Sequence, residues 1–542
     1  MNLKINWPSW KTACFVLIAL WFWPSLAPHD PWKPDESYIL GLVYEYTLRD
    51  NWLVPMLSGE PFMEKPPLFF WTAAAFSRYV FPWLPVHTAA RLAAAFYIAL
   101  TFIFAALAAG QFAARKRVKD PSQAAWFTAI LLAGTLGLAG NGHHILTDSA
   151  LFASFAIALY AFSIFPKQPL VSGLLMGTAW GMAFLTKGLL GPGCLGLAAL
   201  LLPLFDRIYR QKAYLLTLSI ALLVALPWWL IWPWRLWLAS PELFHTWFWV
   251  NNFGRFLGEN NLGPEYRHGF YLKILPWHAF PLILYLPVLF FRQRLDAFKN
   301  AAPAALLCLL TYTILSLAKT SMELYAVPAV VAFAVWMGAQ ASCVPAAFER
   351  RFGLVALCLL AISALVLWWA WAALYFGLPL QARLLHFLPG FAEQPNWLGV
   401  LSALALTIFV WNLAWRVPQR AKHEGAVRWL AVLVMSYGLV FSLLLPALNY
   451  SKSYKPMMLD LATQLDKTQC LASFGLGEHE RGNFHYYTTM RVERFEIGRG
   501  KECPQLLIQG SIMSANIGDY TLLKKTTRTA GRYEEFSVWR KS

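Results

Sequence analysis

The sequence predicts an all-α polytopic membrane domain followed by a small α/β domain, and three observations lead to that prediction. Of the 542 residues, 58% are hydrophobic and only 13% are charged, whereas a soluble globular chain is about one quarter charged. Aromatic residues reach 16%, including 27 tryptophans, which suits rings placed at membrane interfaces. Residues 449–542 break this pattern, because they are polar and mixed in charge.

Hydrophobic runs of about 20 residues are each long enough to cross the hydrocarbon layer of a membrane. The first run is expected to be a retained anchor rather than a cleaved signal peptide. The shorter run 67–81 carries Arg78 and is expected to form an interfacial or re-entrant helix. The sequence therefore predicts thirteen spans, near residues 12–28, 88–113, 123–141, 149–166, 170–186, 188–205, 213–233, 275–291, 302–318, 324–341, 353–376, 396–415 and 427–448.

Lysine and arginine predict the orientation of these spans, because cytoplasmic loops are enriched in both. With thirteen spans and a cytoplasmic N-terminus, every basic loop falls on the cytoplasmic side. The net charge of +17 therefore reflects this bias and not a surface for nucleic acid. The basic positions are Lys4, Lys11, Arg115, Lys116, Arg117, Lys119, Lys167, Arg207, Arg210, Lys212, Arg292, Arg294, Lys299, Arg350, Arg351, Arg416, Arg420, Lys422 and Arg428.

This topology divides the chain into a membrane domain, residues 1–448, and an extracytoplasmic domain, residues 449–542. The membrane domain carries two long outer loops, 29–87 and 234–274. In the second domain, CLASFGL, RVERFEI and PQLLIQG are strand-like and lie between turn residues, and KPMMLDLATQL is typical of a helix. Cys470 and Cys503 lie in this domain, where an oxidising compartment permits a disulfide; two separate buried thiols are the alternative.

Ionisable residues gather at the outer mouths of several spans, where they are costly and are usually functional or paired. A lysine binds phosphate as a point charge, and a carboxylate can take a proton from an attacking hydroxyl. The combination predicts a site for a lipid-linked phosphate substrate. The residues are Asp35, Glu36, Glu64, Lys65, His143, His144, Asp148, Lys187 and Lys319.

Most of these residues also have a purely structural interpretation, which for His143 and His144 is that of polar loop residues. Asp35 and Asp148 each stand where a helix is expected to begin, so either could be an N-cap. Lys65 could extend to lipid headgroups, and Lys187 and Lys319 could be ordinary interfacial anchors. The placement of all of them on one membrane face favours the functional interpretation.

The stretch DESYILGLVYEYTLRDNWLVPMLSGEPFMEKPPLFFWTAAAF resembles the first periplasmic loop of lipid A aminoarabinose transferases, which belong with the protein O-mannosyltransferase-like glycosyltransferases of the GT-C fold. HTAARLAAAF, LTDSALF, FLTKG and SLAKTSMELYAVPA resemble later motifs of that family, in the same order. Glu-Lys-Pro-Pro is the most specific match. Three positions depart from the family pattern: Phe62 replaces a tyrosine, Leu189 a proline, and Asn251-Asn252 a Glu-His pair.

The resemblance implies a role for each matching residue. Asp35 would be the principal catalytic carboxylate, with Glu36 and Asp148 beside it, and Tyr325 would line a lipid cavity. Glu64 would lie at a metal or structural site, where His245 or His268 would have to replace the absent histidine. The donor phosphate would be bound by Lys65, Lys187, Arg255 and Lys319.

The function implied is sugar transfer from a polyprenyl-phosphate donor to lipid A or another envelope acceptor, at the periplasmic face of a bacterial inner membrane. No cofactor is required, because the donor is already activated, and a zinc ion is doubtful without the histidine. A protein O-mannosyltransferase is the alternative enzyme. A transporter or flippase of lipid-linked substrates is the alternative of another class, although the sequence has none of the repeated halves typical of transporters.

Overall fold

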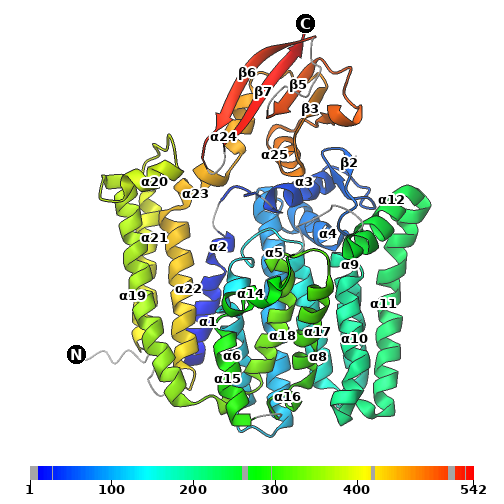
Figure 1. Ribbon diagram of the computed structural model, residues 1–542, viewed down its shortest axis with the longest axis vertical. Coiled ribbons are helices and arrows are strands. Elements are labelled where there is room, and N and C mark those ends of the chain that lie inside the picture. Colours follow the sequence, from blue (N-terminus) through cyan, green and yellow to red (C-terminus); the bar gives the residue numbers. More distant parts are fainter. Residues whose placement is uncertain are drawn as a thin grey trace.

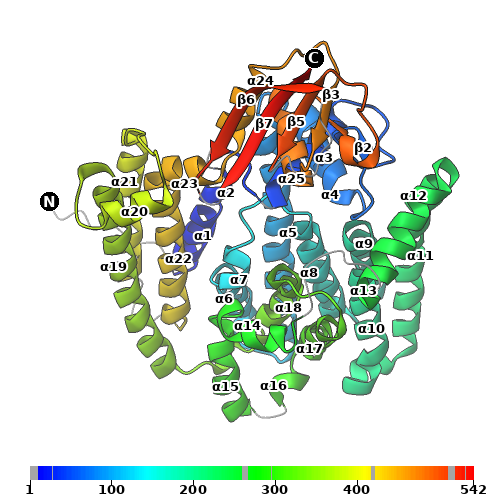
Figure 2. The same ribbon diagram turned by 45° about the horizontal axis from the view of Figure 1, so that its top comes forward.

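The computed structural model has a helical body with a small sheet domain at one end (Figure 1). Figure 2 shows α19 (Ala346–Phe376) and α21 (Trp397–Arg416) at one flank of the body and α11 (Lys212–Ala239) at the other. The structure describes residues 10–26, 29–33, 35–258, 267–293, 296–416, 422–510, 519–530 and 533–542.

Within those residues, six helices are long and apolar enough to cross a membrane, and a bent pair makes a seventh candidate. The chain is thus a multi-pass membrane protein, while the number of thirteen spans stays a prediction. The six are α5 (Val86–Arg115), α9 (Pro169–Lys187), α11, α19, α21 and α22 (Glu424–Leu443). Shorter apolar segments are Trp10–Leu26, α8 (Asp148–Ile164), α10 (Leu190–Phe205), α17 (Ala302–Leu317) and Glu323–Gly338.

The bent pair departs from the straight span predicted at 275–291. It consists of α14 (Phe270–His278) and Leu282–Arg292 within α15 (Leu282–Gln293), and the two axes meet at 91°. Pro281 stands at the break and has no N–H to continue a helical hydrogen-bond ladder. The run therefore turns where a straight helix was expected.

Glycines at every fourth position let α9 and α11 approach closely. Gly173, Gly177 and Gly181 all face α11, and a Cβ on Gly173 would lie 2.8 Å from the carbonyl oxygen of Thr217 and from the Cβ of Ile220. Small residues at this spacing allow helix backbones to pack closely in membranes, where van der Waals contact drives association.

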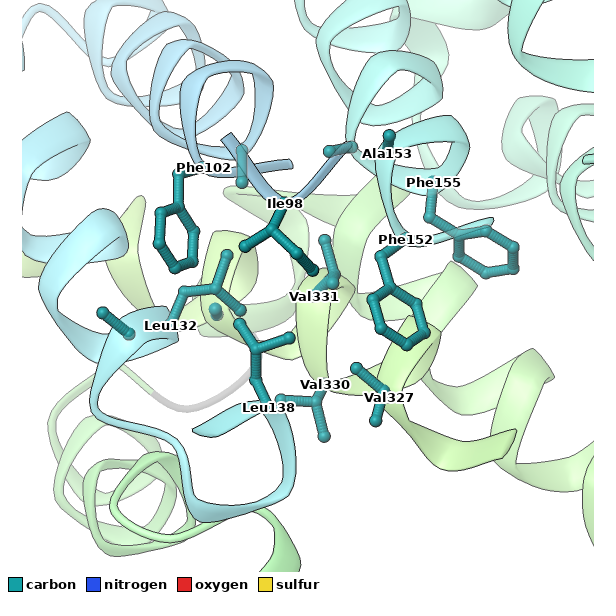
Figure 3. Packing of buried hydrophobic residues seen from close by; sticks show 14 of the residues in the cluster. Ile98, Phe102, Leu132, Leu138, Phe152, Ala153, Phe155, Val327, Val330 and Val331 are labelled. Carbon is teal, nitrogen blue, oxygen red and sulfur yellow. The ribbon is translucent and has the colours of Figure 1, made fainter. Parts of the chain in front are cut away.

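The centre of the body is a continuous apolar core. Figure 3 shows Ile98 and Phe102 of α5 among side chains from four other helices. Since these helices form one packed unit, their outer ends are held at fixed positions relative to one another. The other labelled residues come from α6 (Pro121–Ala133), α7 (Leu136–Ala139), α8 and α18 (Val327–Gly338).

Short elements of the first long loop, residues 29–87, cover the end of the body next to the sheet domain. They are α3 (Asp35–Thr47), the hairpin β1 (Met56–Leu57) and β2 (Glu60–Pro61), α4 (Leu68–Ala75) and the π-helix η1 (Phe76–Val80). The second loop forms α12 (Pro241–His245), the π-helix η3 (Thr246–Gly254) and α13 (Arg255–Leu257). Other short elements are α1 (Trp10–Trp21), α2 (Trp23–Leu26), η2 (Arg207–Arg210), α16 (Asp296–Lys299), η4 (Glu323–Ala326), η5 (Ala341–Cys343) and α20 (Gln381–Phe387).

The C-terminal part forms a five-stranded sheet in the order β4-β3-β5-β7-β6. Strand β3 is parallel to β4 and β5, and β7 is antiparallel to β5 and β6. Cys470 and Cys503 form a disulfide, which decides between the two alternatives for this pair. The elements are α23 (Leu445–Lys452), α24 (Lys455–Ala462), β3 (Leu471–Phe474), α25 (Glu478–Thr488), β4 (Glu493–Arg494), η6 (Phe495–Ile497), β5 (Gln505–Gln509), β6 (Tyr520–Arg528) and β7 (Glu534–Lys541).

Helix α25 lies between the sheet and α3 and attaches this domain to the membrane part (Figure 1). Gly41 of α3 meets Gly482 of α25 so closely that a Cβ on Gly41 would lie 2.7 Å from the Gly482 Cα. Lys33 adds ion pairs to Glu480 at 2.5 Å and to Glu534 at 3.0 Å. The N-terminal end of α25 is thereby held over the outer end of the helical body.

Candidate active site

A cavity of about 610 Å³ lies where the first loop, the second loop, several helix ends and α25 meet. Its polar wall contains both carboxylates and lysines, and its apolar wall comes mainly from α10, α17 and η3. The residues that line it are Asp35, Tyr38, Glu64, Lys65, Pro66, Asp148, Lys187, Leu189, Leu190, Gly193, Cys194, Asn251, Asn252, Phe253, Phe256, Ile314, Leu315, Ala318, Thr320, Met322, Leu324, Tyr325, Glu478 and His479.

A short hydrogen-bond chain connects Lys65 to Asp35 through Tyr38. The Lys65 ammonium donates to the Tyr38 hydroxyl at 2.6 Å, and that hydroxyl donates to Asp35 Oδ1 at 3.4 Å. Burial opposes the charge on Lys65, but the neighbouring Tyr38, Asp148 and Asp35 raise its pKa above its ordinary value. Lys65 therefore stays protonated at the cavity wall, and it does not extend to lipid headgroups.

Asp148 and Lys187 form a second pair of opposite charge. Asp148 is the first residue of α8 and is fully buried, and its Oδ1 lies 2.5 Å from the Lys187 ammonium at the end of α9. The same ammonium lies 4.3 Å from the centre of the Tyr325 ring, in a cation–π contact. Lys187 thus has partners within the protein and is not an interfacial anchor.

The turn after Lys187 is built for close contact with the second loop. Gly188 has a φ of +69°, a region that favours glycine, and a Cβ there would lie 2.9 Å from Asn252 Cγ. The Asn252 side chain accepts from Leu189 N–H at 3.2 Å and donates to the Trp247 carbonyl at 2.8 Å. The Thr-Lys-Gly motif and Asn252 together fix the backbone at the end of α9, and with it the position of Lys187.

Six of the predicted site residues do not reach the cavity lining, among them His143 and His144 in the loop before α8. Glu36 is 2% exposed and lies in a separate buried cluster with Arg91, so it corrects the expectation of a second acid beside Asp35 in the cavity. Lys319 is exposed at the rim, between the lining residues Ala318 and Thr320. His245 and His268 are exposed and lie outside the lining. The side chain of Arg255 falls outside the part of the chain that the structure describes.

The residues present do not assemble the metal site that the resemblance implies. Glu64 lines the cavity, but neither substitute histidine lies there with it. In the described residues no group of three histidine, cysteine, aspartate or glutamate side chains could hold a metal ion. The position of the family's histidine is occupied by Asn252, whose amide bonds to backbone groups. Zinc in proteins is held by three or four such ligands, so no step of the reaction is assigned to a metal here.

We expect activity to survive removal of divalent ions. After treatment of the purified protein with a chelator, the transfer rate should match that of an untreated sample, because the donor carries its own leaving group. Elemental analysis before and after chelation checks that metal was removed. One tightly bound zinc per chain, lost together with activity in Glu64→Gln, would contradict this expectation.

The C-terminal domain contributes two cavity residues that sequence reasoning missed. Glu478 and His479 begin α25 and line the cavity. The His479 ring meets the Tyr38 ring edge to face, with centroids 5.4 Å apart. Burial raises the pKa of Glu478, and the nearby Glu64 raises it further. Nothing in the sequence around Gly477-Glu478 indicates that these residues contact the first loop, more than 400 positions earlier. The contact exists only because α25 packs on α3.

Comparisons with known proteins identify similar sequences and structures. The family model "Dolichyl-phosphate-mannose-protein mannosyltransferase" matches residues 11–244. An undecaprenyl phosphate-α-4-amino-4-deoxy-L-arabinose arabinosyl transferase of Pseudomonas savastanoi pv. phaseolicola is 27% identical over 318 residues, covering 57% of each chain. One from Erwinia tasmaniensis is 25% identical, covering 74% of this chain and 73% of that one. One from Sodalis glossinidius is 29% identical, but the chain spans only 45% of its length.

Solved structures extend the likeness to nearly the whole chain. ArnT from Cupriavidus metallidurans bound to undecaprenyl phosphate has a TM-score of 0.66 at 16% identity, with 97% of both chains covered. The apo form of the same protein gives 0.68. Both the helical body and the C-terminal sheet domain therefore share that fold. The chain therefore shares the fold of ArnT and is similar in sequence to arabinosyl transferases that use undecaprenyl phosphate-α-4-amino-4-deoxy-L-arabinose, of which it spans about half the length in the first relatives.

Proposed function

We propose that the chain transfers a sugar from a polyprenyl-phosphate carrier to an extracytoplasmic acceptor such as lipid A. The observation that carries the proposal is that one cavity holds two lysines, each linked to a carboxylate. Lys65 is linked to Asp35 through the Tyr38 hydroxyl, and Lys187 is paired directly with Asp148. The relatives are named as transferases that use an undecaprenyl-phosphate sugar, and a structural neighbour is described as bound to undecaprenyl phosphate.

The lysines suit a phosphate leaving group. In the proposed reaction the bond between the anomeric carbon and the phosphate oxygen breaks, and its electron pair stays on the phosphate. The ammonium groups of Lys65 and Lys187 stabilise the charge that grows there, which is often the largest catalytic contribution of a site. The apolar wall, with residues such as Ile314, Leu315 and Phe256, suits the first part of the lipid chain.

The carboxylates suit the acceptor side of the reaction. If the acceptor is a hydroxyl, its oxygen bonds to the anomeric carbon and its proton passes to Asp35. If the acceptor is a lipid phosphate, no proton needs to leave and Asp35 orients the sugar. Glu64 and Glu478 give the cavity a second acidic wall, which can accept hydrogen bonds from hydroxyl or amino groups of the sugar.

A transfer assay tests the proposal. Membranes that contain the protein are supplied with a labelled polyprenyl-phosphate sugar, and the label is followed into lipid A, protein and other glycans. Label in lipid A supports the proposal. Label in protein favours the mannosyltransferase alternative, which the matching family model supports. Label that crosses the membrane but stays on its carrier would indicate a flippase.

We further propose that the cavity and the C-terminal domain face the periplasm, from a bacterial inner membrane. The basic loops support this: Lys119 follows α5, and Lys212 begins α11. In Figure 1, α16 with Lys299 lies at the end of the body opposite the sheet domain.

Reporter fusions test this orientation. Fusions after Lys119 and Lys212 should report the cytoplasm, and those after Gly59 and Lys467 should report the periplasm, because cytoplasmic loops retain lysine and arginine. Alkaline phosphatase and a fluorescent protein, fused at the same positions, serve as complementary readouts. A cytoplasmic signal at Lys467 would place the cavity on the wrong face and contradict the proposal.

A further inference from the structure

Glu36 follows Asp35 directly but lies in a buried polar cluster outside the cavity lining. Its carboxylate and the Arg91 guanidinium are 2% and 1% exposed. Arg91 Nε lies 3.2 Å from Glu36 Oε1, and its two terminal nitrogens donate to the carbonyls of His29 and Asp30 at 2.7 and 3.2 Å. An ion pair this deeply buried costs desolvation energy, so its hydrogen bonds to the surrounding backbone are central to its stability.

The two oxygens of Glu36 accept backbone hydrogen bonds from two separate segments. Oε2 accepts from Trp32 N–H at 3.0 Å, within the segment that leads into α3. Oε1 accepts from Ile145 N–H at 3.0 Å, in the loop that leads into α8. Ile145 lies three residues before Asp148. One carboxylate therefore joins the segment that carries Asp35 to the segment that carries Asp148.

The ionised form of Glu36 is the form that this arrangement stabilises. Burial alone would raise its pKa, but Arg91 and His144 hold that pKa well below its ordinary value. His144 Nδ1 and His29 Nδ1 lie 3.7 and 3.9 Å from its oxygens. Glu36 itself is 2% exposed and does not line the cavity, so it does not contact a substrate there.

We propose that Glu36 and Arg91 are positioning residues that fix the separation of Asp35 and Asp148 across the cavity. The proposal rests on the transfer reaction proposed above and assigns a role to two residues that touch neither substrate. Because Asp148 is paired with Lys187, the hydrogen bonds of Glu36 and Arg91 also set the position of Lys187. Reactive groups must be held in close alignment for transfer, and a displacement of about 1 Å costs roughly 10²-fold in rate.

Three substitutions separate positioning from binding. Glu36→Gln keeps the size of the side chain, but its amide nitrogen cannot accept from one of the two N–H groups. Glu36→Asp keeps the charge but is too short to reach both segments. Arg91→Lys keeps the charge but loses the fork that holds the carbonyls of His29 and Asp30. In each variant we expect kcat to fall by about 10²-fold, while the affinity for undecaprenyl phosphate falls far less, because only Lys187 moves with Asp148 and Lys65 keeps its hydrogen bond to Tyr38.

Glu349 provides a matched control. It is also a buried carboxylate, 1% exposed, and it accepts from Gly425 N–H at 2.8 Å and from the Tyr285 hydroxyl at 2.9 Å. No residue of α15, α19 or α22, the described helices that Glu349 joins, lines the cavity. Glu349→Gln should lower thermal stability as Glu36→Gln does, but leave kcat near that of the original protein.

The measurements are kcat, the affinity for undecaprenyl phosphate and the thermal unfolding temperature, for all four variants. The proposal is overturned if the Glu36 and Arg91 variants keep their turnover, or if turnover falls only in step with stability, as in the Glu349 control. Should Glu36→Gln not fold, Glu36→Asp and Arg91→Lys decide by the same criteria. Absence of transfer by the unaltered protein would instead refute the proposed function.

Discussion

Asp35→Asn is expected to abolish most sugar transfer, with a fall in kcat of about 10²- to 10⁴-fold, the usual contribution of a positioned acid or base. Asparagine has nearly the same size and can still accept from the Tyr38 hydroxyl, which lies 3.4 Å from Asp35 Oδ1. It has no charge and cannot take a proton. Binding of the donor lipid should persist, because the lysines are unchanged. The measurement is a transfer assay with purified protein, alongside binding of undecaprenyl phosphate.

Asp50 offers a control for this substitution. It lies in the same loop, is 90% exposed and pairs with Arg78 at 2.7 Å, and it does not line the cavity. Asp50→Asn should leave transfer and stability almost unchanged, because exposed ion pairs contribute little. If Asp35→Asn stayed active and lost only thermal stability, Asp35 would have the capping role that its position at the start of α3 also allows.

Lys65→Ala is expected to lower kcat/KM for the donor by about 10²- to 10³-fold, the effect of losing one group that stabilises an oxyanion. Pro66 and Pro67 fix the backbone after Lys65 and so limit where its ammonium can reach. Lys65→Arg should also be impaired, because a planar fork does not reproduce a compact ammonium. The measurement is initial rate against donor concentration.

Arg78→Ala is the matched control for Lys65→Ala, since it removes a cation from the same loop outside the cavity. Its ion pair with Asp50 is at the surface, and we expect donor use to remain near normal. Equal losses in the two variants would mean that the overall charge of the outer face, and not the site of Lys65, determines donor use.

The fold class can be predicted from the sequence because each membrane span requires a long run of apolar residues. Long apolar runs identified most of the helical body, and polar segments with turn residues identified the sheet domain. The bend between α14 and α15 was missed, because a hydrophobic run has the same composition whether it is straight or bent. The sequence alone does not decide whether the disulfide forms, since two cysteines 33 residues apart do not reveal how the strands between them align.

The sequence predicts only part of the site, because local patterns do not reveal how side chains and distant segments are placed in the fold. Asp35, Glu64, Lys65, Asp148, Lys187 and Tyr325 were identified by motif, and all six line the cavity. Glu36 was assigned with Asp35 because the two are adjacent, but successive residues on a helix point in directions about 100° apart. Glu478 and His479 reach the cavity only through the docking of α25, which no local pattern encodes.

Reconstitution of the purified protein with defined lipids tests directly whether it transfers a sugar from a polyprenyl-phosphate donor to lipid A. Proteoliposomes would contain a polyprenyl-phosphate sugar and lipid A, and mass spectrometry would follow both. We expect lipid A to gain one sugar mass for each free polyprenyl phosphate released, and Asp35→Asn to prevent both changes while the donor still binds. Release of polyprenyl phosphate without any gain on an acceptor, or equal transfer by Asp35→Asn, would contradict this expectation.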